Sequence, residues 1–311
     1  MSGGVRSRKR PRRHYNTRMP SAQPDCAGAA LDAALTRRHL ALACARCVVE
    51  IVPAIDSTNS ELLRRARSGA LPAEPALFCL LAAEHQQAGR GRLGRTWVAP
   101  AGAALTVSFA RRFALDIGAL GGLSLVCGLA LLDALRAHGV DAQLKWPNDV
   151  LVADRKLAGI LVEVHAEAPD RALAVIGIGI NTTPVTRPAV TGTAGAPAAL
   201  PPADMTSLRQ ASGQRDPVDR NRLLADLAVA LGQALEQFAA DGFAPFVEAW
   251  NAAHAWRNRM VEVRSGEDSV LAGTARGVDA EGRLCIDTPT GLRTVIAGEV
   301  SVRAARVGEA C

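Results

Sequence analysis

The sequence has no apolar run of the roughly 18 residues that a membrane-spanning helix needs. Its basic N-terminus has no apolar stretch behind it, so it lacks the form of a secretory signal. The Gly-x-Ser-x-Gly elbow of many serine hydrolases is also missing. With 311 residues, 49% of them hydrophobic and 21% charged, the chain has the size and composition of a globular protein with one large and one small domain. These features predict a cytoplasmic protein with no membrane partner.

Cysteine is present, but its pattern does not indicate pairing, because the count of seven is odd and the spacing is scattered. Cys79 and Cys127 lie inside apolar runs, which is typical of buried, reduced thiols in the cytosol. Cys44 and Cys47 form a single Cys-x-x-Cys pair without a second pair or nearby histidines, whereas a structural zinc ion needs four ligands. The pattern therefore argues against a disulfide framework and against a zinc site.

Acidic residues are absent from residues 1–18, which contain seven of the cations in a chain of net charge +6. Without that segment the other 293 residues carry a net charge of −1, so the body of the protein is close to neutral. A basic run of this kind can neutralise nucleic-acid phosphates. The simpler interpretation, which we favour, is a disordered extension that precedes an alternative start at Met19.

Three parts are predicted along the chain. Residues 1–48 form a basic extension that is disordered apart from one helix, residues 49–257 form the large domain, and residues 258–311 form the small one. The large domain has many apolar strands and few helices, which predicts an α+β fold with a mixed β-sheet flanked by helices. In the small domain, short strands separated by turns that contain Gly and Asp predict an all-β barrel.

Several local predictions concern helices and loops. Thr58 and Glu61 have the spacing of a capping box at the start of a helix. A single long core helix is predicted over residues 117–138, and another over residues 219–240. Residues 183–204 are rich in Pro, Ala, Thr and Gly, and are predicted to be a loop insertion.

The segment Gly89-Arg90-Gly91-Arg92-Leu93-Gly94-Arg95 combines three glycines with three arginines. Glycine lets the backbone approach a ligand closely, and guanidinium groups bind carboxylates and phosphates. The segment is not a Walker loop, because no Gly-Lys-Ser/Thr follows it and no helix opens directly behind it. Taken alone, it is either a flexible basic turn or a loop that binds an anionic ligand.

Three more clusters follow along the chain. Lys145-Trp146-Pro147-Asn148-Asp149 predicts a rigid turn whose carboxylate could hold magnesium or orient a cation. Lys156 precedes the apolar strand ILVEV, where it could stabilise negative charge that develops on an oxygen. The first two clusters also have structural interpretations, as an Asx-type turn that caps a strand and as a hairpin turn with solvated cations. Gly177-Ile178-Gly179-Ile180-Asn181 places glycines in a strand, which marks the close approach of another group.

Together and in this order, these motifs resemble those of the biotin protein ligase family. The resemblance is carried by Ser57-Thr58-Asn59, EHQQAGRGRLGRTW, KWPNDVLV, RKLAGILVE and GIGIN, which lie between about residues 55 and 182. The later helices and the small β-domain also fit, so the resemblance covers about 80% of the chain. It implies a catalytic domain similar to the class II synthetases, followed by an SH3-like barrel.

Members of that family join biotin to ATP, which gives biotinyl-5′-adenylate and pyrophosphate, and then pass the biotinyl group to one lysine of a biotin carboxyl carrier protein. The resemblance implies Mg²⁺ as the ion that accompanies ATP, with Asp149 as its candidate ligand. The implied catalytic residues are Lys156, Arg92 and Asp149. The implied biotin-binding residues are Ser57, Thr58, Asn59, Gln86, Arg90, Gly91, Arg92 and Lys156. The implied ATP- and adenylate-binding residues are Arg90, Arg92, Arg95, Trp97, Asn148, Lys156 and Asn181.

Some members of the family carry an N-terminal winged helix-turn-helix and act as repressors. About 50 residues precede the catalytic region here, without a three-helix pattern, so we expect neither repressor activity nor a nucleic-acid partner. Lipoate–protein ligases share the architecture and the adenylate chemistry and are the nearest alternative, but GRGRLGRTW together with KWPND favours biotin. Assembly into a homodimer stays an open alternative.

Overall fold

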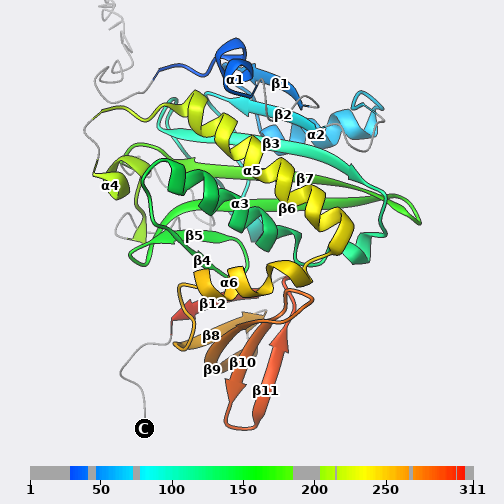
Figure 1. Ribbon diagram of the computed structural model, residues 1–311, viewed down its shortest axis with the longest axis vertical. Coiled ribbons are helices and arrows are strands. Elements are labelled where there is room, and N and C mark those ends of the chain that lie inside the picture. Colours follow the sequence, from blue (N-terminus) through cyan, green and yellow to red (C-terminus); the bar gives the residue numbers. More distant parts are fainter. Residues whose placement is uncertain are drawn as a thin grey trace, which may run out of the picture.

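The computed structural model describes residues 29–40, 47–72, 78–184, 204–213, 216–265, 269–298 and 300–304. The basic segment 1–18 and almost all of the 183–204 insertion lie outside these ranges. Figure 1 shows the described chain as a large sheet with helices laid across it and a smaller sheet at its C-terminal end.

The large domain is built on a seven-stranded sheet with the strand order β1-β2-β3-β7-β6-β5-β4 (Figure 1). β1 and β2 are parallel, and every other neighbouring pair in this sheet is antiparallel. This is the mixed sheet that the sequence predicts. The bounds are β1 (Cys47–Val52), β2 (Phe78–Ala83), β3 (Ala104–Phe113), β4 (Gln143–Lys145), β5 (Asp149–Val152), β6 (Arg155–Ala168) and β7 (Arg171–Asn181).

Helices cover both faces of this sheet. One face packs against α1, α3 and α5, and alternate residues of β3 such as Leu105 and Phe109 point into that core. The other face packs against α2, where Leu62 clusters with Leu81 and Val175. Thr106 and Ser108 of β3 therefore lie on the α2 side of the sheet. The bounds are α1 (Ala33–Leu40), α2 (Thr58–Arg67), α3 (Leu123–Ala137), α4 (Leu208–Ser212), α5 (Arg220–Asp241) and α6 (Val247–Ala253).

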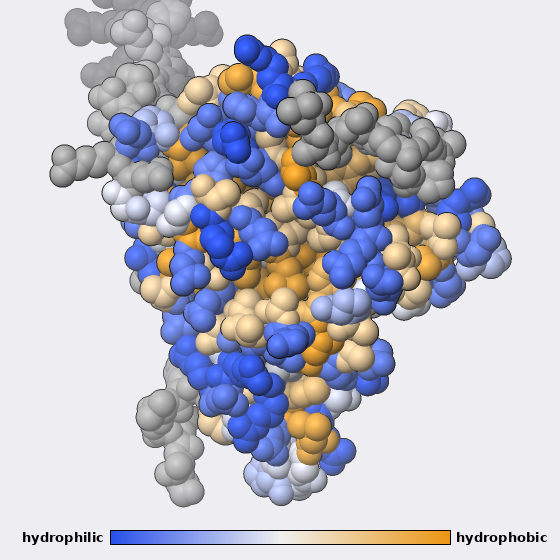
Figure 2. Space-filling view, in the orientation of Figure 1, coloured by the Kyte–Doolittle hydropathy of each residue, from blue (hydrophilic) through white to orange (hydrophobic). Residues whose placement is uncertain are grey.

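Two helical stretches, Ile117–Ala137 and Arg220–Asp241, are long and apolar enough to cross a membrane by length and composition alone. In the fold, 56% and 44% of their most apolar windows are buried. Core helices meet the same criteria, and here α3 and α5 pack against each other and against the sheet. Figure 2 shows hydrophilic residues interspersed with apolar ones on the outer side of these helices.

The predicted helix over 117–138 is wrong at its start. Ile117–Leu120 form a 3₁₀ turn, and α3 begins only at Leu123. Gly122 has a φ of 80°, a conformation that favours glycine, and a Cβ atom there would lie 2.6 Å from Cγ of Phe243. The chain therefore breaks at Gly122, where the packing of Phe243 leaves no room for a side chain.

Helix α2 is capped one residue earlier than the capping-box spacing predicts. Its N-cap is Ser57, whose Oγ accepts a hydrogen bond from the backbone N of Ser60 at 3.4 Å. Thr58 is the first helical residue, and its Oγ1 lies 2.7 Å from Oγ of Ser108 on β3. The hydroxyl of Thr58 is therefore used on the sheet and not on the helix.

The C-terminal domain is a five-stranded antiparallel sheet with the order β11-β10-β9-β8-β12. Three side chains of the large domain bond main-chain groups of this domain: Trp146 Nε1 donates to Gly282 O at 3.1 Å, Arg92 Nη2 to Gly298 O, and Asn251 Nδ2 to Val278 O at 3.1 Å. The strands are β8 (Met260–Ser265), β9 (Ser269–Val278), β10 (Leu284–Thr288), β11 (Gly291–Val295) and β12 (Val300–Ala304).

The described part of the N-terminal region packs against the large domain. Helix α1 lies on α5, and Leu31 and Leu40 are buried in the main core. The backbone N of Leu31 donates to Glu84, which also pairs with the buried guanidinium of Arg220 at 2.7 Å. Residues 29–40 are therefore part of the folded body.

Candidate active site

A polar floor forms where the N-terminus of α2 meets β2 and β3. The backbone N and Oγ1 of Thr58 donate to Oε1 of Gln86 at 2.8 and 3.1 Å. Oγ of Ser108 lies 2.7 Å from Oγ1 of Thr58 and donates to Oδ1 of Asn59 at 2.5 Å. Ser57, Thr58 and Asn59 are each no more than 3% exposed. Residues from three distant parts of the sequence thus form one hydrogen-bonded surface.

The Gly89–Arg95 loop is held at its base by main-chain hydrogen bonds. Gly91 N donates to Arg95 O at 2.7 Å, and Trp97 N donates to Gly89 O at 2.9 Å. A Cβ atom at Gly89 would lie 2.3 Å from the carbonyl oxygen of Trp97, so a side chain does not fit there. The backbone bonds fix the path of the loop, and its arginine side chains extend from that frame.

Arg90 and Arg92 extend to chemically different partners. Arg90 forms an ion pair with Glu163 on β6, with Nη2 and Oε1 2.8 Å apart. Nη1 of Arg92 donates to Oδ1 of Asn148 at 3.1 Å, and Nη2 bonds the main-chain carbonyl in the C-terminal domain. Burial lowers the pKa of Arg92, while the nearby carboxylate of Asp149 opposes that shift. Among the described residues, Arg92 therefore has neutral hydrogen-bond partners and a charge that no carboxylate pairs.

Asp149 lies between two lysines. Nζ of Lys156 donates to Oδ1 of Asp149, and Nζ of Lys145 lies 3.4 Å from Oδ2. Burial by itself would raise the pKa of Asp149, but the two ammonium groups hold that pKa below its ordinary value. Burial lowers the pKa of Lys145, whose Nζ lies 4.6 Å from the centroid of the Trp256 ring. Two cations and one anion leave a net positive charge that would attract an anionic ligand.

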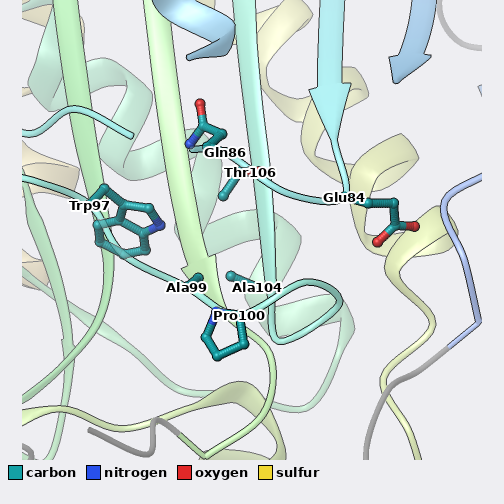
Figure 3. A pocket seen from close by; sticks show the side chains of 7 residues that line it. All are labelled: Glu84, Gln86, Trp97, Ala99, Pro100, Ala104 and Thr106. Carbon is teal, nitrogen blue, oxygen red and sulfur yellow. The ribbon is translucent and has the colours of Figure 1, made fainter. Parts of the chain in front are cut away.

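Trp97 packs on β7 beside Lys156. A Cβ atom at Gly179 would lie 2.5 Å from Cε2 of Trp97, and one at Gly159 would lie 3.1 Å from Nζ of Lys156. The Nε1–H of Trp97 is buried and has no acceptor among the described residues, so a bound ligand could supply one. Figure 3 shows the adjacent pocket between Trp97 and Glu84, lined by Glu84, Gln86, Trp97, Ala99, Pro100, Ala104 and Thr106.

Asn148 and Asn181 both use their amide groups to brace the backbone near Lys156. Nδ2 of Asn148 donates to Ile160 O at 2.8 Å, and Nδ2 of Asn181 donates to Thr206 O at 3.1 Å. Asn181 is 2% exposed, whereas Arg95 is exposed at the end of the loop. Most of the predicted site residues therefore converge on the α2 side of the sheet, and Arg95 is close enough for its positive charge to help lower the pKa of Arg92 and of Lys145.

Comparison with known proteins agrees with this arrangement. Residues 53–181 match the Biotin/lipoate A/B protein ligase family, and residues 258–303 match the Biotin protein ligase C terminal domain. The Biotin--[acetyl-CoA-carboxylase] ligase of Paracoccus denitrificans is 39% identical over 79% of this chain and 96% of its own length. The Bifunctional ligase/repressor BirA of Escherichia coli is 38% identical over 83% of this chain and 74% of its own length.

The chain belongs to the biotin protein ligase family. A solved biotin protein ligase from Aquifex aeolicus in complex with biotin and ATP has a TM-score of 0.65 to it, with 25% identity over 84% of this chain and 100% of that one. These matches confirm the resemblance that the motifs indicate, and with it the α+β fold and the SH3-like C-terminal domain. The chain is thus a ligase.

Three residues of this ligase site carry no assigned role in the sequence interpretation. Ser108 is hidden in the strand AALTVSFARR, although strict alternation places it on the face opposite Phe109. Glu163 is an acid within the apolar run ILVEV. This pattern indicates a specific role, because a carboxylate in an apolar strand needs a hydrogen-bonding or charged partner. Lys145 is visible in KWPND, but only the fold brings it to Asp149.

The residues around Asp149 do not form an all-protein magnesium site. The carboxylate of Asp149 is already engaged by the ammonium groups of Lys156 and Lys145. Within the described ranges, no group of three or more His, Cys, Asp or Glu side chains is placed to hold a metal ion. Among the residues that the structure describes, fewer than three such side chains are therefore available to a metal ion at this point.

Proposed function

We propose that this ligase activates biotin with ATP and transfers it to one lysine of a biotin carboxyl carrier protein. In the first step, a carboxylate oxygen of biotin attacks the α-phosphorus of ATP, the bond from that phosphorus to the bridging oxygen breaks, and pyrophosphate leaves. In the second step, the neutral lysine amine attacks the biotinyl carbonyl carbon, AMP leaves, and the amine loses a proton. The two steps are needed because a carboxylate does not acylate an amine, whereas its mixed anhydride with AMP does.

The observation that carries this proposal is the Lys156–Asp149 pair close to the unpaired charge of Arg92. Biotin carboxylate and ATP are both anions, so bringing them together costs electrostatic energy. Cations that are fixed before the reaction offset that cost without reorganising, and they act more strongly in a partly buried site than in water. Asp149 holds Lys156 in place, and its lowered pKa makes it a weak base, so we assign it mainly to this positioning.

The polar floor supports biotin as the carboxylate substrate. The ureido ring of biotin carries N–H donors and a carbonyl acceptor, which need fixed hydrogen-bonding partners when they are removed from water. Thr58, Asn59 and Gln86 present such groups in a rigid arrangement at the start of α2, the helix whose N-cap is Ser57. Gly91 and the rest of its loop would then lie over the bound acid and shield the adenylate from water.

We assign the nucleotide to the side of the site that holds Trp97, Asn148 and Asn181, with Arg95 at its exposed edge. The indole N–H of Trp97 is a buried donor available to a ligand oxygen. We further propose that Mg²⁺ enters on the ATP phosphates, since Mg²⁺ is commonly held by substrate phosphates and few protein carboxylates. We place the reaction in the cytoplasm, with the carrier protein as macromolecular partner.

The test is incubation with labelled biotin, ATP, Mg²⁺ and a biotin carboxyl carrier domain, followed by mapping of the labelled lysine. We expect one labelled lysine and pyrophosphate release that requires biotin. Lipoic acid serves as the matched control, because it is also a sulfur-containing ring acid with a pentanoate chain. Labelling by lipoate in preference to biotin, or no pyrophosphate release with biotin, would overturn the proposal.

A further inference from the structure

Glu163 is the acceptor for two side chains that belong to different halves of the biotin site. Its Oε2 accepts a hydrogen bond from Nδ2 of the buried Asn59 at 2.9 Å. The same carboxylate accepts hydrogen bonds from both terminal nitrogens of Arg90, at 2.8 and 3.1 Å. Glu163 therefore joins the floor of the site to the Gly89–Arg95 loop.

The floor side of this junction is rigid. Asn59 has little freedom, because a Cβ atom at Gly177 would lie 2.3 Å from its Oδ1, so the amide fills the space over that glycine. From Asn59 the hydrogen bonds continue through Ser108 and Thr58 to Gln86. One chain of hydrogen bonds thus runs from the loop arginine to the far side of the floor, and such networks restrain all their members together.

The loop side shows why Arg90 and Arg92 are not equivalent. The bidentate pair with Glu163 neutralises the charge of Arg90 and points its guanidinium at β6, with Oγ of Ser60 a further 3.4 Å contact. Arg92 bonds the neutral oxygen of Asn148 and keeps an unpaired charge near Asp149. Of the two arginines, Arg92 has the charge that is available to an anionic substrate.

We propose that Glu163 is a positioning residue for biotin, and that Arg90 acts on the substrate through Glu163 and not by direct contact. The ion pair sets where the loop begins over the floor, and the Asn59 bond sets the orientation of the floor itself. This inference rests on the proposed function, because it concerns how that site binds its carboxylate substrate. It also replaces the sequence-based assignment of Arg90 to biotin and phosphate.

A double-mutant cycle separates this role from direct contact. Arg90→Ala, Glu163→Gln and the double variant are compared by biotin-dependent pyrophosphate exchange at saturating ATP. Gln at 163 keeps the size of the side chain and an oxygen for Asn59, but it loses the charge that pairs Arg90. We expect each single change to raise the KM for biotin about three- to tenfold, with kcat within about twofold, since the side chain of Arg90 is 45% exposed and that of Glu163 is 21% exposed. The double variant should show the same increase as either single one.

Direct contact predicts a different pattern. If Arg90 bound biotin or phosphate itself, Arg90→Ala would lower kcat as well, and the double variant would show the product of the two single effects. Either result would overturn the inference. Arg90→Lys, which can restore an ion pair with Glu163, should recover at least half of the lost biotin affinity under our proposal.

A matched control lies on the same strand. Glu167 on β6 pairs with Arg112 on β3 at 2.8 Å, away from the floor and the loop. Glu167→Gln should leave the KM for biotin within about twofold of the original while changing the melting temperature as much as Glu163→Gln does. If Glu167→Gln raised the KM equally, the effect at 163 would be structural and the inference would fail. Absence of pyrophosphate exchange in the unaltered protein would instead contradict the proposed function.

Discussion

Trp97 and Gly179 are in such close contact that a Cβ atom at position 179 would lie 2.5 Å from Cε2 of the indole. Trp97 follows the arginine loop, and Gly179 lies in the central strand β7, so this contact fixes the end of the loop against the sheet. The indole also lines the pocket in Figure 3. Any side chain at position 179 must therefore displace the indole of Trp97, which lines the pocket.

We predict that Gly179→Ala raises the KM for biotin or ATP at least tenfold, because the displaced indole disturbs the pocket and the loop end. Steady-state pyrophosphate exchange measures this effect. Gly232→Ala in α5 is the control, since a Cβ atom there meets nothing within 4 Å and alanine favours a helix by about 1 kcal/mol over glycine. That variant should keep its activity and melt at a higher temperature. Unchanged KM values in Gly179→Ala would show that Trp97 can move freely.

Removal of the ammonium group in Lys156→Ala should lower the rate of adenylate formation by about a hundredfold or more, as expected for loss of a preorganised charge. Single-turnover formation of biotinyl-adenylate is the measurement. Arg171→Ala, at the other end of the same β6–β7 hairpin, removes an exposed cation and should leave the rate unchanged. Near-normal adenylate formation without Lys156 would remove it from the catalytic group.

Loss of the Arg92 side chain should release the reactive intermediate. In Arg92→Gly, the bonds to Asn148 and to the C-terminal domain disappear, so we expect free biotinyl-adenylate in solution and labelling of bystander lysines. Leu93→Gly is the control in the same loop, because Leu93 has a φ of 56° that suits glycine and is exposed. That variant should retain its intermediate. If both variants retained biotinyl-adenylate equally well, the proposed role of the Gly89–Arg95 loop in covering the intermediate would be contradicted.

His254 should make folding stability depend on pH. Burial lowers the pKa of His254 to about 4, from an ordinary value near 6.5, with Arg257 adding to the shift. The unfolded chain therefore binds more protons between these values, so this contribution is complete above about pH 6.5 and is lost as pH falls toward 4. Between pH 7.5 and 5 the loss is about 2 kcal/mol.

Urea unfolding at the two pH values tests this expectation. In His254→Gln the free energy of unfolding should change less between pH 7.5 and 5, by about the same 2 kcal/mol. If His254→Gln kept the full pH dependence of the original protein, the source would be elsewhere.

Sequence patterns predicted the mixed sheet and the small β-domain, and they singled out most of the residues that the fold gathers around Lys156 and the arginine loop, because these depend on local signals. The β3 and β7 strands show alternation or apolar runs, and the glycine–arginine loop is unusual in composition. Roles that depend on pairing across the sheet were not available from spacing. Nothing in the sequence pairs Arg90 with Glu163, which lie 73 positions apart.

Errors of one or a few residues had specific tertiary causes. The N-cap of α2 is Ser57 and not Thr58, because the hydroxyl of Thr58 bonds Ser108 and Gln86 instead of the helix backbone. The long helix over 117–138 broke at Gly122 because Phe243 packs there. In both cases a partner from a distant segment outweighed the local preference.

Three hydrogen bonds between the two domains end on the backbone of the C-terminal domain. Arg92, Trp146 and Asn251 bond the carbonyl oxygens of Gly298, Gly282 and Val278. A carbonyl oxygen is present whatever the side chain, so a substitution at Gly298 or Val278 leaves the acceptor in place. A substitution at Gly282 is different, because its φ is 77° and a Cβ atom there would lie 3.0 Å from Cα of Gly122. What can break them is a change in chain length, since inserting or removing one residue in a turn moves every later carbonyl. Substitution scanning of the small domain would thus under-report its importance, and insertion scanning would reveal it.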